Sequence, residues 1–247
     1  MYRFFVEPSQ VEETVIRICG SDVNHIKNVL RMKPGEKIRI SGPARENYFC
    51  EIAEIEDSFV RASILEKDET GTELPNRIYL FQGLPKNDKM EWIIQKTVEL
   101  GVYEVIPVAM KNCVVKLDDK KAKSKVTRWQ AIAESAAKQS KRSLIPEVKM
   151  PMSYKEAVAY AKKLDVKLVP YENEHGMAGT KAAMEQIKKG ESIAVFIGPE
   201  GGFDESEIAL AQENGISPIT LGKRILRTET AGMAVLSVLM FQLEGRE

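Results

Sequence analysis

Over roughly the first 70 residues of the chain, apolar residues gather in short segments that turn residues separate. The segments are rich in β-branched and aromatic side chains, and turn signals such as Pro34-Gly35 lie between them, which is typical of β-strands. The predicted strands are Tyr2–Val6, Thr14–Ile18, Lys37–Ser41, Tyr48–Ile55 and Phe59–Leu65. One predicted helix, beginning at Ser21 or Asp22, has an apolar face formed by Val23, Ile26, Val29 and Leu30. Short strands with this spacing predict a small β-barrel.

From residue 77 onward, strand-like apolar segments alternate with longer segments whose apolar positions recur at helical spacing. The predicted strands are Arg77–Gln82, Glu104–Val108, Val166–Val169, Ser192–Ile197 and Ser217–Leu221. The predicted helices are Asp88–Leu100, Ser124–Gln139, Tyr154–Leu164, Lys181–Lys189, Asp204–Glu213 and Thr228–Leu243. This alternation predicts an α/β domain in which helices cover both faces of a parallel sheet. The polar segment Lys67–Pro75 divides the two patterns, so the predicted domains are residues 1–72 and 73–247.

Composition indicates an ordinary globular protein. Of its 247 residues, 43% are hydrophobic and 29% charged, and 36 basic residues balance 36 acidic ones, which excludes a polybasic or acidic tail protein. Cys19, Cys50 and Cys113 are far apart, so we expect neither a disulfide framework nor a metal site. No signal peptide is recognisable, and the apolar stretch Ala231–Phe241 is too short to cross a bilayer. We therefore expect a soluble protein of the reducing cytoplasm.

One segment is strongly basic although the whole chain is neutral. Residues 111–149 carry 11 basic and 4 acidic side chains, with Trp129 among them. Cations beside an aromatic side chain suit contact with an RNA backbone and stacking on a base. A solvated helix face explains the same charges equally well. Lys121, Lys123 and Arg128 are the residues of this segment that we predict to bind RNA.

Two loops at predicted strand ends could hold a ligand. The first, Ile197-Gly198-Pro199-Glu200-Gly201-Gly202-Phe203, precedes a helix that opens with Asp204, Glu205 and Glu207. It has neither phosphate-binding fingerprint, and the carboxylates already occupy the positive end of the helix. This favours a neutral or cationic ligand over a phosphate. The alternative is a tight turn before an ordinary acidic first turn.

The second loop, Gly222-Lys223-Arg224-Ile225-Leu226-Arg227, leads into the last predicted helix. Thr228 is its predicted N-cap, and Glu229 lies in the first turn. The alternative role for Glu229 is only to complement the helix dipole. The apolar Ile225 and Leu226 would suit the rim of a pocket for adenine or another aromatic group.

These motifs resemble the bacterial 16S ribosomal RNA uridine-N3 methyltransferases, a family of the trefoil-knotted SPOUT class. The resemblance rests on the two strand-end loops, Ile197–Phe203 and Leu221–Ala231, and on three further stretches. The further stretches are His25–Arg31, Lys96–Val102 and Glu134–Arg142. The matching segments keep the family order and span nearly the whole chain.

The resemblance implies an N-terminal PUA-like β-barrel for RNA and a C-terminal SPOUT α/β domain with a trefoil knot for S-adenosyl-L-methionine. It also implies a homodimer whose active site borders both subunits, and N3-methyluridine in the decoding region of 16S rRNA as the product. The expected cofactor-binding residues are Pro170, Tyr171, Glu172, Ile197, Gly198, Pro199, Gly201, Gly202, Leu221, Gly222, Ile225, Leu226 and Thr230. The expected RNA-binding residues are Arg3, His25 and Arg31, together with Lys121, Lys123 and Arg128.

Uracil N3 carries a proton and is a poor nucleophile until that proton leaves. An enzyme must therefore align the partners and stabilise the developing anion or remove the proton. Arg227 and Arg142 are candidates for stabilising the anion, and Glu229 is a candidate base. Two alternatives stay open: a non-catalytic RNA-binding ribosome factor, and a methyltransferase for another base or atom of RNA.

Overall fold

The computed structural model describes residues 1–42, 46–68, 71–172, 174 and 176–244. The chain divides into two compact units. The first comprises Met1–Glu73 together with the later segment Lys138–Leu144, and the second comprises Leu74–Ala137 and Ile145–Glu247. The return of residues 138–144 to the first unit had no signal in the sequence, because it depends on contacts between distant residues.

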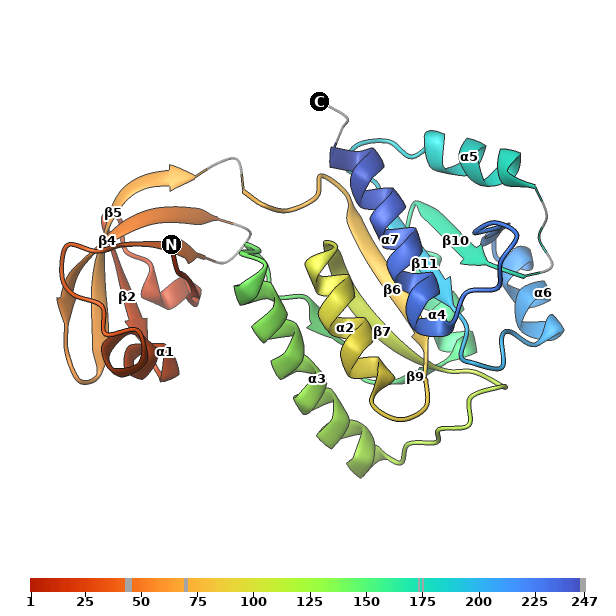
Figure 1. The fold of residues 1–247 in the computed structure, drawn as a ribbon, viewed down its shortest axis with the longest axis horizontal. Coiled ribbons are helices and arrows are strands. Elements are labelled where there is room, and N and C mark those ends of the chain that lie inside the picture. Colours follow the sequence, from red (N-terminus) through yellow and green to blue (C-terminus); the bar gives the residue numbers. More distant parts are fainter. Residues whose placement is uncertain (43–45, 69–70, 173, 175, 245–247) are drawn as a thin grey trace. The chain divides into compact units, whose positions relative to one another are not determined.

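The first unit is built on a five-stranded sheet in the order β1-β3-β4-β5-β2 (Figure 1). Its strands are β1 (Arg3–Phe5), β2 (Val15–Cys19), β3 (Lys37–Ser41), β4 (Asn47–Ile55) and β5 (Phe59–Asp68). The pairs are antiparallel except for β1 with β3. No pairing among the described residues joins β1 to β2, so this is a curled open sheet rather than the expected closed barrel. Ile16, Ile38 and Ile52 are fully buried in its core.

The helix of the first unit begins as predicted but changes its hydrogen bonding halfway. A short α-helix, α1 (Ser21–Asn24), continues as a π-helix, η2 (His25–Val29), and the amide of Leu30 donates to the carbonyl of His25 at 2.8 Å. The wider turn changes the angular position of the residues that follow. Val29, expected on the apolar face, is 61% exposed as a result.

The later segment of the first unit is held by Glu73. This carboxylate pairs with Arg142 and accepts hydrogen bonds from the amides of Ser143, at 2.8 Å, and Leu144, at 3.2 Å. Both side chains of the ion pair are almost fully buried. Hydrogen bonds satisfy the remaining oxygen positions, which is what a buried ion pair requires.

The second unit is built on a parallel sheet in the order β12-β10-β11-β6-β7-β8, and β9 also pairs with β7. Its strands are β6 (Arg77–Gly83), β7 (Val102–Ala109), β8 (Glu147–Val148), β9 (Met152–Ser153), β10 (Val166–Pro170), β11 (Ser192–Ile197) and β12 (Ser217–Ile219). Every pairing is parallel, as the alternating pattern predicts. The stacked rings of Phe81 and Phe196, 4.4 Å apart, join the two central strands. The sequence missed β8 and β9, which have only two residues each.

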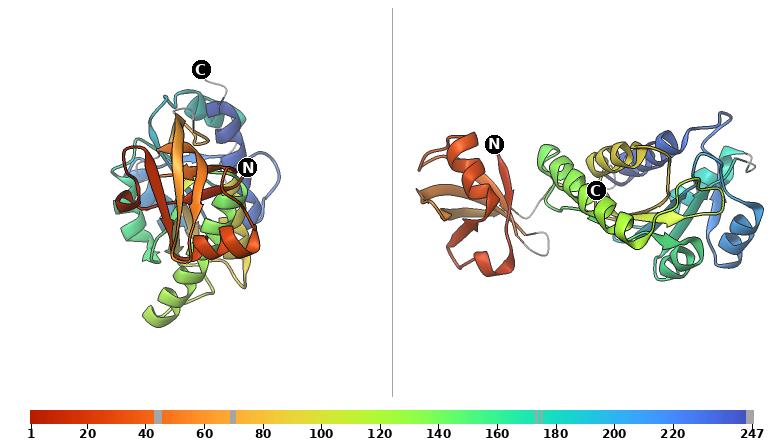
Figure 2. Two further views of the ribbon diagram at one scale, coloured as in Figure 1. Left: turned by 90° about the vertical axis from the view of Figure 1, so that its left-hand side faces the viewer. Right: turned by 90° about the horizontal axis from the view of Figure 1, so that it is seen from below.

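Helices cover both faces of this sheet. They are α2 (Lys89–Glu99), α3 (Asp119–Gln139), α4 (Tyr154–Ala161), α5 (Met177–Glu185), α6 (Glu205–Glu213) and α7 (Thr228–Glu244). The pair α2 and α7 lies on one face, and α4 and α6 lie on the other (Figure 2, right). Helix α3 begins five residues before the predicted Ser124, because the Asp118 carboxylate accepts a hydrogen bond from the Lys121 amide at 2.8 Å and caps it. None of the described helices combines the length and apolar composition needed to cross a membrane.

Candidate functional site

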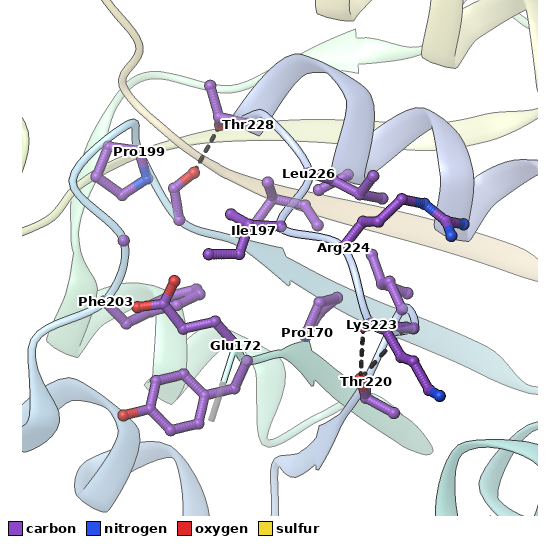
Figure 3. A pocket seen from close by; sticks show the side chains of 17 residues that line it. Pro170, Glu172, Ile197, Pro199, Phe203, Thr220, Lys223, Arg224, Leu226 and Thr228 are labelled. Carbon is purple, nitrogen blue, oxygen red and sulfur yellow. Dashed lines mark hydrogen bonds between the residues drawn. The ribbon is translucent and has the colours of Figure 1, made fainter. Parts of the chain in front are cut away.

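A pocket opens at the carboxyl ends of β10, β11 and β12, where α7 begins (Figure 3). Ligands of parallel sheets bind at this edge. Its lining consists of Pro170, Tyr171, Glu172, Ile197, Gly198, Pro199, Gly202, Phe203, Thr220, Leu221, Gly222, Lys223, Arg224, Ile225, Leu226, Thr228 and Ala231. The strand-end loops that the sequence singled out therefore come together in one place.

The loop after β11 packs against the end of β6 and against Asn112. A Cβ atom at Gly83 would lie 2.7 Å from the nitrogen of Pro199, so the end of β6 admits only glycine without a shift of the loop. At Gly201 a Cβ would lie 3.0 Å from the Cβ of Asn112, whose side-chain amide donates to the carbonyls of Gly201 and Gly202 at 3.1 and 3.3 Å. Gly201, expected to contact the cofactor, therefore packs against Asn112 and is not part of the pocket lining.

The start of α6 is closed to phosphate. The Asp204 carboxylate accepts a hydrogen bond from the amide of Ser206 at 3.0 Å, and the Glu207 carboxylate accepts one from the amide of Asp204 at 3.0 Å. Lys111 lies 2.8 Å from Asp204, and its hydrogen bond is the main cause that lowers the pKa of Asp204 to about 2. Because side-chain carboxylates satisfy the amide donors at this helix end, a phosphate would meet negative charge here.

Thr228 joins three elements of the pocket. Its hydroxyl donates to the carbonyl of Gly198 at 2.6 Å and accepts a hydrogen bond from the side-chain amide of Gln82 at 2.9 Å. The prediction that Thr228 is the N-cap of the last helix is wrong. The carbonyl of Arg227 accepts hydrogen bonds from the amides of Thr230 and Ala231, both at 2.8 Å, so the turn closes one residue earlier. The hydroxyl of Thr228 is thereby free to link β11, β6 and α7.

Lys89, at the start of α2, bridges two carboxylates of the site. Its ammonium nitrogen lies 3.0 Å from Glu200 and 3.2 Å from Glu229. Burial by itself would raise the pKa of Glu200, but hydrogen bonds from Lys89 and from the Lys86 amide hold it below its ordinary value. The hydrogen bond with Glu200 raises the pKa of Lys89. The sequence offered no sign of this bridge, because more than 100 residues separate Lys89 from either carboxylate.

The proposed catalytic residues have different surroundings. Arg227 is exposed at the end of the loop that precedes α7, and Glu229 lies in the first turn of α7 with 18% of its side chain exposed. Neither lines the pocket, although Thr228 between them does. Arg142 belongs to the first unit, where it is 4% exposed and engaged by Glu73.

Eleven of the thirteen expected cofactor residues line the pocket, and Gly201 and Thr230 do not. Thr230 is exposed on the first turn of α7. Sequence reasoning missed six lining residues, which are Phe203, Thr220, Lys223, Arg224, Thr228 and Ala231. All six lie within or directly beside the loops already identified, so taking each loop as a whole would have included them.

The residues expected to bind RNA in the first unit fall into two groups. Arg3 is 7% exposed, and its guanidinium donates to Ser41 at 2.8 Å and to Asn47 at 2.7 Å. It is part of a buried polar network, so in this structure it does not present its charge to RNA. His25, the first residue of the π-helix, and Arg31, which follows the helix, are both exposed, and His25 also packs edge-on against Phe4.

In the basic segment, Lys121 and Lys123 are exposed, whereas Arg128 pairs with Glu91 on α2 through two contacts of 2.8 Å. Trp129 is only 4% exposed. The prediction that an RNA base stacks on Trp129 is therefore wrong, because the ring is buried on the inner side of α3. In the described parts of the chain, no three His, Cys, Asp or Glu side chains are grouped so as to hold a metal ion.

Comparisons with known proteins agree with this architecture. Residues 72–240 match the model of an RNA methyltransferase domain, and residues 18–65 match that of an RNA methyltransferase PUA domain. The chain is 39% identical to ribosomal RNA small subunit methyltransferase E of Bacillus subtilis, over 99% of this chain and 98% of that protein. It is 37% identical to the protein of the same name from Mesomycoplasma hyopneumoniae, over 96% and 98% of the two chains.

A solved structure supports the same likeness in three dimensions. Ribosomal RNA small subunit methyltransferase E from Neisseria gonorrhoeae, bound to S-adenosyl methionine, superposes on this chain with a TM-score of 0.82 and 33% sequence identity. The superposition covers 98% of this chain and 97% of that one. The likeness therefore extends over both units.

Proposed function

We propose a reaction for this protein on the premise that the chain belongs to the RNA methyltransferase family that includes ribosomal RNA small subunit methyltransferase E. The proposed reaction transfers the methyl group of S-adenosylmethionine to N3 of one uridine in the decoding region of 16S rRNA. The small ribosomal subunit, in the cytoplasm, is the proposed substrate. The single observation that carries the proposal is the pocket formed by the ends of β10, β11 and β12 with the start of α7.

The residues of this pocket fit S-adenosylmethionine. Leu221, Ile225 and Leu226 provide apolar contacts for an adenine ring, and backbone groups of the two loops are available to its polar edge. Glu172 provides a carboxylate beside Gly202, where a Cβ atom would lie 3.9 Å from its oxygen. That negative charge suits a cationic cofactor, and the capped start of α6 disfavours nucleotide phosphates. When bound, the cofactor would supply a methyl group on a sulfonium centre.

The proposed chemistry forms a bond from uracil N3 to the methyl carbon and breaks the bond from that carbon to sulfur. The N3 proton leaves to the Glu229 carboxylate, and Arg227 stabilises the negative charge that develops on the uracil. Lys89, 3.2 Å from Glu229, holds the carboxylate in position and also competes with the proton for it. Arg142 has no place in this proposal, because Glu73 engages its guanidinium within the first unit.

We propose that two copies of the chain form a homodimer through the outer face of α7, so that the active site borders both subunits. From Ala231 to Phe241 helix α7 is apolar except for Ser237, and Val238 and Phe241 are 50% and 82% exposed. Large exposed apolar side chains on one helix are typical of an interface. The dimer would also bring a second set of loops near Arg227.

Two structural features complete the proposal. The chain leaves the edge strand β12 and returns as α7 to pack on β6, β11 and α2, which supports the trefoil-knotted path of the SPOUT class. In the first unit, the exposed His25, within the π-helix, and Arg31, just after it, are the residues proposed to contact RNA.

Cofactor binding and product identity test this function directly. Calorimetry with S-adenosylmethionine, S-adenosylhomocysteine and ATP should show binding of the first two only. Small subunits that lack the modification, incubated with the protein and labelled cofactor, should yield N3-methyluridine after digestion. Binding of ATP but of neither sulfur compound would refute the cofactor, and binding of small subunits without any methylation when cofactor is supplied would instead indicate a non-catalytic ribosome factor. A different methylated nucleoside would refute the proposed base.

A further inference from the structure

Two of the residues that line the pocket are cations whose combined charge the single carboxylate of the cofactor does not balance. Lys223 and Arg224 are exposed on the loop between β12 and α7, and neither forms an ion pair or a side-chain hydrogen bond in the described parts of the chain. Figure 3 shows their side chains directed away from Glu172 and Phe203. S-adenosylmethionine carries a sulfonium and an ammonium but only one carboxylate, so its net charge is positive. Two further cations beside it therefore raise the energy of the bound state unless they face another anion.

The basic segment 111–149 has the opposite property. Seven of its eleven cations already form ion pairs with carboxylates of the described chain. Arg128 with Glu91 and Lys111 with Asp204 are examples in the second unit. A cation that already neutralises a carboxylate gains less from a phosphate, because that carboxylate must first be left behind. The segment with the most basic residues is therefore not the surface with the most positive charge left to bind phosphate.

We infer that Lys223 and Arg224 bind backbone phosphates of the RNA next to the target nucleotide. The inference rests on the proposed function. It means that the loop between β12 and α7, which lines the cofactor pocket, also makes the RNA contact closest to the reaction. One face of this loop lines the cofactor pocket through Leu221 and Leu226, and its two cations extend outward from the same turn. Gly222, with a φ of 106°, provides the left-handed turn that precedes them. A guanidinium and an ammonium are the groups that proteins use for phosphate.

The test measures the salt dependence of equilibrium binding to small ribosomal subunits that lack the modification. The test variant is Lys223→Gln with Arg224→Gln. The matched control is Lys155→Gln with Lys162→Gln, which removes two exposed lysines of the same unit, one in α4 and one at its C-cap. Binding is measured by sedimentation at several salt concentrations, without cofactor. Affinity for S-adenosylhomocysteine is measured separately by calorimetry.

We expect the double variant to reduce the slope of log K against log salt by about 1.4, because each lost contact with single-stranded phosphate contributes roughly 0.7. The control should keep the wild-type slope. The exchange of Lys223→Arg with Arg224→Lys, which retains both charges, should also keep most of it. Affinity for S-adenosylhomocysteine is the second readout, because both residues also line the pocket.

An unchanged slope in the test variant would overturn the inference, and so would an equal loss of slope in the α4 control. A loss of cofactor affinity with an intact slope would assign both residues to the cofactor instead. Failure of the proposed function has a different signature. The wild-type protein would then not bind S-adenosylhomocysteine or not methylate the subunit, whatever its RNA binding shows.

Discussion

The hydroxyl of Thr228 is the contact on which the geometry of the pocket most depends, and Thr228→Val removes it at nearly constant volume. Thr228 is 6% exposed, so water cannot readily replace the lost partner. Valine retains the β-branched shape and the packing of the first turn of α7. Only the hydrogen bonds to the Gly198 carbonyl and from the Gln82 amide disappear.

The expected cost follows from these two bonds. Each is worth about 1 kcal/mol net, and a buried acceptor left without a donor costs a further 1–3 kcal/mol or so. Gln82 keeps its hydrogen bond to the Gly83 carbonyl at 3.1 Å, so its amide is not left without a partner. The Gly198 carbonyl loses its donor. We therefore expect the free energy of unfolding to fall by about 3–5 kcal/mol.

Urea unfolding followed by tryptophan fluorescence measures this loss in the relevant unit, because both tryptophans, Trp92 and Trp129, lie in the second unit. The midpoint should fall while the slope against urea stays constant. Affinity for S-adenosylhomocysteine should fall as well, because Gly198 is part of the pocket lining. Thr230→Val, on the exposed side of the same turn, is the control and should change neither quantity. A loss below about 0.5 kcal/mol for Thr228→Val would refute the reasoning, because that is the range of ordinary surface substitutions.

Three further outcomes are expected. Glu229→Gln should lower the single-turnover rate strongly at neutral pH, with partial recovery at higher pH; a near-normal rate would remove Glu229 as the base and leave it as the partner of Lys89. The Asp204 carboxylate, whose pKa falls from 3.8 to about 2 beside Lys111, contributes stability that is complete above pH 4 and is lost as the pH falls toward 2. The difference in melting temperature between the wild type and Asp204→Asn should therefore shrink over that interval; a constant difference would contradict this. Phe241→Glu should convert the proposed dimer into a monomer in light scattering, and an unchanged dimer would place the interface elsewhere.

The positions of the helices and strands were largely accessible from the sequence, because each depends on local pattern. The strand Ser192–Ile197 was predicted with its observed bounds, and its apolar run identifies a buried central strand. The missed elements are those that local pattern does not determine. Strands β8 and β9 are too short to have a period, and the π-helical turn after Asn24 depends on how Ile26 packs in the core.

The site was accessible in its loops but not in its side-chain partners. Glycine-rich strand ends are visible in the sequence, and both loops identified in this way line the pocket. The pairing of Gln82 with Thr228 joins residues 146 positions apart, and no local signal reports it. The roles of two arginines were predicted wrongly for the same reason, because their partners are distant in the sequence. Arg3 was expected to bind RNA and Arg142 to stabilise the uracil anion, yet Asn47 and Glu73 hold them in the interior.

The ion pair between Glu73 and Arg142 also sets an order of events during synthesis of the chain. The N-terminal unit includes residues 138–144, which leave the ribosome only after residues 74–137 of the second unit have been made. At about 5–20 residues per second, Arg142 follows Glu73 by several seconds. Until then the carboxylate must stay hydrated, because a buried charge without its partner costs about 3–5 kcal/mol. The nascent N-terminal unit therefore lacks residues 138–144, and with them the partner of Glu73, until that later part of the chain is made. A fragment that ends after the N-terminal sheet would lack this segment altogether.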